Sequence, residues 1–89
     1  MARIHFTQQL ARFTTLPQVE SGQRVLRAAL DDAFDLNPRL RGYVLDDQGH
    51  LRENVVIFVD GMRTRDPRAL DDELQPASTV YVMQALSGG

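Results

Sequence analysis

The chain has 89 residues, a net charge of −2 and no cysteine. This length suits one domain, near the lower limit of what folds without disulfides or a structural metal. The absence of cysteine excludes a disulfide framework, a thiolate metal site and a catalytic thiol. The slightly acidic balance argues against nucleic-acid binding, which needs a clustered basic face. Because no stretch approaches a membrane span and the start resembles no signal peptide, we expect a cytoplasmic protein without membrane association.

The first predicted element is a half-buried β-strand from Ala2 to Gln8. Ile4 and Phe6 fall on one face and His5 on the other, which is the period of two that strands show. A second strand is expected from Pro17 to Glu20. Since proline lacks an N–H, this strand should lie at an edge of the sheet or begin at the proline.

An amphipathic helix is predicted to follow, with Ser21 as its N-cap. Its apolar stripe consists of Val25, Leu26, Ala29, Leu30, Ala33 and Phe34. Arg27 falls away from this stripe and is expected in solvent. The helix should stop before Pro38, whose ring disfavours the α conformation at the preceding residue.

In the middle of the chain, the residue pattern predicts an apolar segment that packs on the core, then a turn and a β-hairpin. Apolar residues from Leu40 to Leu45 should cover the core, and the Asp and Gly content of Asp46–Gly49 predicts a turn. Val55–Val59 is the strongest strand, apolar on both faces and therefore expected inside the sheet. Asp60-Gly61 is the preferred pair for a type I′ turn, after which Met62–Thr64 should return as a short strand.

The last strand should begin near Thr79. Because one helix covers only one face of a sheet, the element order predicts an α+β, ubiquitin-like β-grasp fold with a mixed four- to five-stranded sheet and one main helix on one face. With the alternate valines under the helix, Tyr81, Met83 and Phe58 form a candidate partner-binding surface on the open face. The alternative is that residues 9–16 or 65–75 cover them.

Residues 85–89 are predicted to form a flexible tail after a domain that spans residues 1–84. Extended at about 3.3–3.6 Å per residue, the tail carries its carboxylate roughly 17 Å beyond the strand. Gly88 and Gly89 present a bare backbone, which suits delivery of that carboxylate into another protein's active site; a frayed end is the alternative. All ten basic residues are arginine. Either coding bias or protection of an activated terminus from ε-amines accounts for this.

The chain resembles the small sulfur-carrier family of the ThiS/MoaD type, whose members share the fold of ubiquitin and include the small subunit of molybdopterin synthase. The resemblance is carried by the strand and Asp-Gly turn of residues 51–61 and by the ending Ala85-Leu86-Ser87-Gly88-Gly89. Gln84 and Ser87 depart from the family, which commonly has proline and a small apolar residue there.

The resemblance implies a carrier rather than an enzyme, with no catalytic residue, no metal and no bound cofactor. An ATP-dependent partner enzyme would adenylate the Gly89 carboxylate, a sulfur donor would convert it to a thiocarboxylate, and Leu86, Ser87 and Gly88 would thread the active site. An acceptor synthase, such as the large subunit of molybdopterin synthase, would then take the sulfur. The alternatives are a ubiquitin-like modifier joined to lysines through Gly89, a carrier for cysteine, thiamin or another metabolite, and a β-grasp interaction module whose tail does no chemistry.

Overall fold

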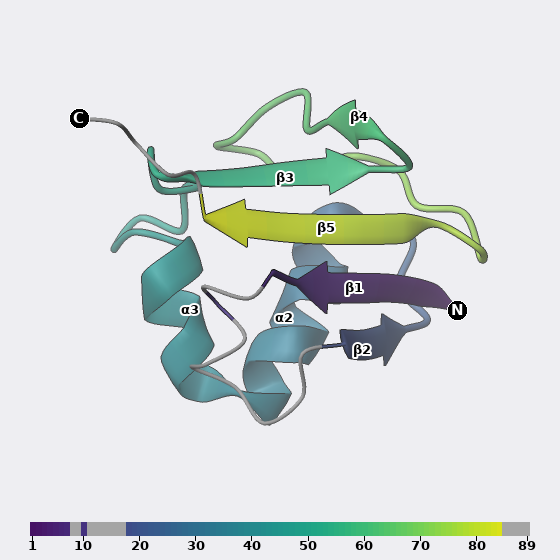
Figure 1. Cartoon of the computed structure of the whole chain (residues 1–89), viewed down its shortest axis with the longest axis horizontal. Coiled ribbons are helices and arrows are strands. Elements are labelled where there is room, and N and C mark those ends of the chain that lie inside the picture. Colours follow the sequence, from purple (N-terminus) through teal and green to yellow (C-terminus); the bar gives the residue numbers. More distant parts are fainter. Residues whose placement is uncertain (8–9, 11–17, 85–89) are drawn as a thin grey trace.

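The computed structural model describes residues 1–7, 10 and 18–84. These residues form a five-stranded mixed sheet in the order β2-β1-β5-β3-β4, with β1 and β5 parallel and the other pairs antiparallel (Figure 1). The strands are β1 (Ala2–Phe6), β2 (Gln18–Ser21), β3 (Val55–Val59), β4 (Met62–Arg63) and β5 (Thr79–Gln84), and the helices are α2 (Leu26–Leu36) and α3 (Pro38–Val44). The predicted α+β, β-grasp architecture is confirmed. Within the described ranges, no helix is both long and apolar enough to cross a membrane.

The core lies between the sheet and the helices. In the register of the sheet, Ile4 pairs with Val80 and Ile57 pairs with Val82, and all four side chains are fully buried. The period-two alternation predicted for the first and last strands is therefore confirmed. Each such side chain removed from water contributes about 1.5–3 kcal/mol to folding.

Helix α2 supplies the other half of the core. Leu26, Ala29, Leu30, Ala33 and Phe34 are buried, as the predicted stripe requires. The inclusion of Val25 in that stripe was wrong, since its side chain is 42% exposed. Val25 precedes the helix in an extended conformation, with φ −127° and ψ 138°, and forms a β-bridge with Glu73.

The N-cap assigned to Ser21 was also wrong. Ser21 is the last residue of β2, and α2 begins five positions later without a side-chain cap. The buried Ser21 hydroxyl instead donates a hydrogen bond of 2.6 Å to Asp32 Oδ2 and accepts one of 3.1 Å from the Gln23 N–H. Ser21 therefore ties the edge strand to the middle of the helix.

Helix α2 ends at Leu36, as the proline predicted, but the chain then starts a second helix. Pro38 occupies the first turn of α3, where its missing N–H has no intrahelical partner to lose. Leu40, Val44 and Leu45 are buried, so the expected cover of the core is confirmed. Its helical form was not predicted.

The β3–β4 hairpin has the predicted turn. Asp60 and Gly61 both have positive φ, 51° and 85°, as a type I′ turn requires. Strand β3 lies between β5 and β4, which confirms its interior place, although β5 holds the centre of the sheet. On the second apolar face of β3, Val56 and Phe58 are only half-buried, whereas Val55, Ile57 and Val59 on the first face are buried.

The connection after β4 packs along the start of α2 and is fixed there by Arg27. The guanidinium donates to three backbone carbonyls, those of Ala69 (3.1 Å), Gly49 (3.0 Å) and Arg68 (2.6 Å). Backbone bonds from Leu26 N–H to the Asp72 carbonyl and from Leu74 N–H to the Arg24 carbonyl reinforce this contact. The expectation that Arg27 is simply solvated was therefore wrong.

Candidate partner-binding face

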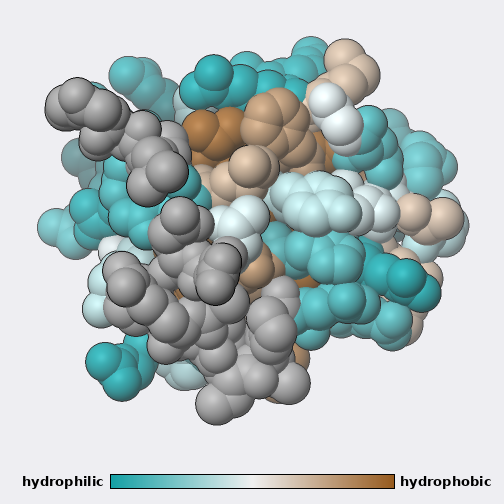
Figure 2. Space-filling model, in the orientation of Figure 1, coloured by the Kyte–Doolittle hydropathy of each residue, from teal (hydrophilic) through white to brown (hydrophobic). Residues whose placement is uncertain are grey.

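The face of the sheet opposite the helices carries the candidate site. Tyr81 and Met83 on β5 are 44% and 37% exposed, and Phe58 and Val56 on β3 are half-buried. The antiparallel register places Phe58 opposite Tyr81 and Val56 opposite Met83. The sheet thus brings together the predicted residues Met83, Tyr81 and Phe58, and Figure 2 shows hydrophobic surface over β3 and β5.

One of the two segments expected as a possible cover lies elsewhere. Residues 65–75 bond to α2 through the contacts of Arg27 and Arg24, and Leu70 and Leu74 are buried in the core. Of the other segment, residues 9–16, the structure describes only Leu10, which is also buried. The connection 65–75 therefore leaves the face open.

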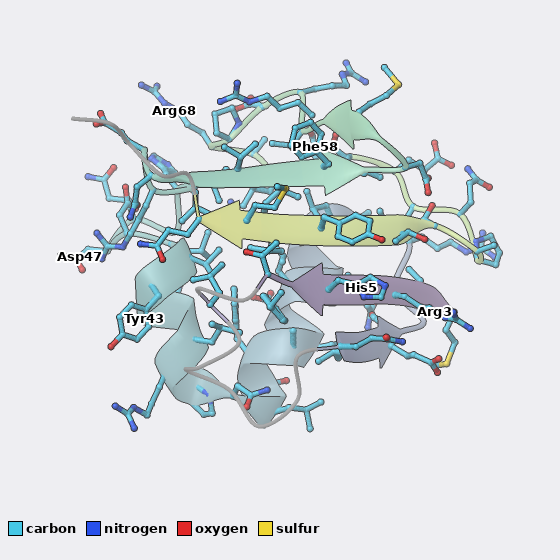
Figure 3. All side chains as sticks on the ribbon, viewed as in Figure 1. Arg3, His5, Tyr43, Asp47, Phe58 and Arg68 are labelled. Atoms are coloured by element: carbon cyan, nitrogen blue, oxygen red, sulfur yellow. The ribbon has the colours of Figure 1, made fainter. Side chains whose placement is uncertain are left out.

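The open face includes His5, which the alternation of the first strand placed on the face opposite Ile4 and Phe6. Its ring stacks on Tyr81 with a centroid distance of 4.9 Å and an interplanar angle of 19°. Figure 3 shows His5 on β1 beside the β5 strand that carries the tyrosine. The alternation of β1 already put His5 on the outward face; its contact with Tyr81 depends on the parallel β1–β5 pairing.

The β3–β4 hairpin adds Arg63 to the same face, directly opposite Phe58 in the register. Its turn is held against β5 by the Asp60 carboxylate, which accepts hydrogen bonds from the Thr79 N–H (2.9 Å) and the Ser78 hydroxyl (2.8 Å). These two donors stabilise the ionised form and lower the pKa of Asp60 below its usual range. The exposed arginine is thereby carried on a hairpin that is fixed at its tip.

The predicted tail, residues 85–89, lies outside the described residues, and with it the predicted site residues Leu86, Ser87, Gly88 and Gly89. The last described residue is Gln84, at the end of β5 and next to Met83. The strand that displays Tyr81 and Met83 is therefore also the last element before the predicted tail. The boundary between a domain of residues 1–84 and a tail of 85–89 stays a prediction. Within residues 1–7, 10 and 18–84, no group of three or more His, Asp or Glu side chains could hold a metal ion.

Comparison with known proteins identifies the fold. No protein-family model matches the sequence, and no curated protein matches it. Solved structures do match. SAMP1 from Haloferax volcanii, a small archaeal modifier protein, has a TM-score of 0.81 and 21% identity over 99% of this chain and 98% of that chain. A chain of the BexX/CysO complex from Amycolatopsis orientalis has a TM-score of 0.84 and 16% identity over the whole of both chains.

CysO from Mycobacterium tuberculosis is similar to the same degree, with a TM-score of 0.82 and 18% identity over 97% of this chain and 100% of that chain. Each match spans nearly the whole of both compared chains, so it includes the sheet, the helices and the hairpin together. The chain has the ubiquitin-like β-grasp fold that these structures share.

Proposed function

We propose that the protein is a sulfur carrier whose Gly89 carboxylate is activated and converted to a thiocarboxylate. The observation that carries the proposal is a β-grasp body whose β5 strand displays Tyr81 and Met83 and leads directly into a segment that ends in Gly-Gly. A partner enzyme can hold the body by its open face while the narrow tail reaches an active site roughly 17 Å away. We place this chemistry in the cytoplasm, where ATP is available.

The chemistry follows from the weakness of a carboxylate as an electrophile. An α-carboxyl group has a pKa of about 3.3–3.7, so it is ionised at pH 7 and needs activation. ATP supplies this by forming an acyl-adenylate with loss of pyrophosphate. Sulfide then attacks the carbonyl carbon and AMP leaves, which gives the thiocarboxylate directly. With a persulfide donor the same attack gives an acyl disulfide, and a thiol must reduce its S–S bond, forming a disulfide with the donor's sulfur, before the thiocarboxylate is released. The chain contributes no catalytic side chain and binds no cofactor in this scheme; the partner enzyme uses the ATP.

Among the pathways such a carrier serves, we put molybdopterin synthesis first, with a large synthase subunit as the acceptor that binds the open face. Carriage of sulfur for cysteine, thiamin or another metabolite is the alternative within the same chemistry. The complex of CysO with BexX supports partner binding, because it shows one structural neighbour assembled with a second protein.

A second candidate is a protein modifier that joins Gly89 to lysines of target proteins. The likeness to SAMP1, a small archaeal modifier protein, favours it. The two functions share the adenylate and differ in the final acceptor. Since the chain contains no lysine, a second copy offers no ε-amine to the activated terminus in either case.

The test is the intact mass of the protein after incubation with an adenylating enzyme of this class, ATP and sulfide. Replacement of one carboxylate oxygen by sulfur adds about 16 mass units, and methionine oxidation adds nearly the same. Fragmentation of the C-terminus therefore has to place the increment on Gly89. The variant that lacks Gly89 should show no increment. Conjugates of higher mass in cell extract, without a thiocarboxylate, would favour the modifier, and no change in either assay would refute both functions.

A further inference from the structure

One row of side chains crosses all five strands of the open face, and its chemistry changes from one edge of the sheet to the other. The register places Arg63 opposite Phe58, Phe58 opposite Tyr81 and Tyr81 opposite His5. Gln18 on β2 completes the row beside His5. Neighbouring strands lie about 4.8 Å apart. Arg63 is therefore one strand away from Phe58 and two strands away from Tyr81, which is a separation of about 10 Å from Tyr81. The row runs from a cation through an aromatic centre to a polar edge.

The charge on this face differs in sign from that of the whole chain. The chain has a net charge of −2, yet the five strands as described place a single carboxylate on the open face, Glu20. Glu20 is paired with Arg3, with 3.7 Å between Oε1 and Nε. Arg63 is exposed, and its guanidinium has no hydrogen-bond or ion-pair partner among the described residues. The unneutralised charge of the face is therefore positive and sits beside Phe58.

Arg63 lines a hollow together with three acidic residues, Asp60, Asp72 and Glu73. Asp60 accepts hydrogen bonds from Ser78 and Thr79. Asp72 accepts hydrogen bonds from the Thr64 hydroxyl and the Arg65 N–H. Glu73 is exposed, and among the described residues none of the three carboxylates is paired with the Arg63 guanidinium. Within the part of the chain that the structure describes, the Arg63 guanidinium is therefore a donor without a partner at the edge of the apolar surface around Phe58.

We propose that the open face binds a partner segment with an apolar side chain, which packs on Phe58 and Tyr81, and a neighbouring carboxylate, which pairs with Arg63. This inference rests on the proposed carrier function and specifies the chemistry of its partners. Arginine presents a planar fork that matches a carboxylate in two parallel hydrogen bonds. Tyrosine and arginine are the residue types that most often dominate binding at interfaces, and charge complementarity selects the partner and its orientation.

The test uses random 12-residue peptides displayed on phage and selected on the immobilised full chain. Enriched peptides should combine Asp or Glu with an aromatic or aliphatic residue one to three positions away. When such a peptide is synthesised and titrated, the amide resonances of β3 and β5 should shift. Arg63→Glu should weaken binding by about tenfold or more, as expected for loss of a close charge pair at an interface. Arg39→Glu makes the same change in charge on α3, is exposed, and should leave affinity within about twofold.

Three results would overturn the inference: enriched peptides without acidic residues, equal effects of Arg63→Glu and Arg39→Glu, or resonance shifts confined to the helices. A fourth would be a wild-type dimer in sedimentation experiments that Arg63→Glu dissociates, because the occupant would then be a second copy of the chain. No adenylating enzyme enters this assay. Failure here together with a mass increment on Gly89 would thus reject the acidic partner and leave the carrier function intact.

Discussion

Arg27→Gln should destabilise the domain more than any other exposed or half-exposed arginine substitution. The native guanidinium bonds three carbonyls in two separate segments, the turn at Gly49 and the connection at Arg68 and Ala69. Two of these bonds are partly buried and one is exposed. Taking about 1–1.5 kcal/mol for each partly buried bond and less for the exposed one, we expect a loss of about 2–4 kcal/mol in the free energy of unfolding.

The assay is urea denaturation followed by circular dichroism, with thermal unfolding beside it. For a domain of this size, the expected loss corresponds to a fall in Tm of about 10–25 °C. Arg27→Lys keeps the charge but loses the planar fork, so it should give an intermediate loss. Arg24→Gln is the matched control, because the Arg24 side chain is exposed and has no hydrogen-bond or ion-pair partner among the described residues.

A loss below about 0.5 kcal/mol for Arg27→Gln, or a loss equal to that of Arg24→Gln, would refute the anchoring role, since this is the range of ordinary surface substitutions. The prediction also concerns the binding face. The anchored connection follows β4 directly, so loss of the anchor should loosen the hairpin that carries Arg63. Hydrogen exchange at β4 should accordingly accelerate more than exchange at β1.

Three further predictions test the core, the turn and the pH response. Leu30→Ala should cost about 2–5 kcal/mol in urea denaturation because its side chain is fully buried; a loss below 1 kcal/mol would contradict the packing. Gly61→Ala should destabilise by about 1 kcal/mol because φ is +85°, whereas Gly42→Ala in α3 should raise Tm, and equal shifts would refute the turn assignment. The pKa of Asp60 is lowered by the Thr79 N–H and the Ser78 hydroxyl, so its stabilisation is present above about pH 4 and is lost as the pH falls through the folded-state value. Asp60→Asn should therefore be less stable than wild type at pH 7, and the difference should shrink towards pH 2.

The parts of the fold that sequence reasoning recovered are those with a local signal. The alternation of Ile4 and Phe6, the stripe around Leu30 and the Asp60-Gly61 turn each depend on residues within a few positions of one another. The same holds for the outward face of β5, because Tyr81 and Met83 alternate with the two buried valines. The periodicity of side chains along a strand or a helix therefore predicts such features without knowledge of tertiary contacts.

The errors concern residues whose partners are distant in sequence. Ser21 has the chemistry of an N-cap, but a bond to Asp32 and the pairing of β2 with β1 take it into the sheet. Arg27 looks solvated on a helical wheel and is held by carbonyls that lie more than twenty positions away. The contact of His5 with Tyr81 arises from a parallel pairing between the two ends of the chain. No local pattern encodes these partners, because each depends on the completed topology.

The topology also explains how a small domain can place the candidate binding face and the start of the predicted tail on one strand. Strand β5 is the centre of the sheet, paired with β1 on one side and with β3 on the other. Its inward residues, Val80 and Val82, fix it to the core, so the strand that leads to the tail is held by the whole sheet. The outward residues of the same strand form the middle of the open face. A partner bound to that face would therefore contact the strand that precedes the predicted tail, and the length of the segment beyond Gln84 sets how far the terminal carboxylate can reach.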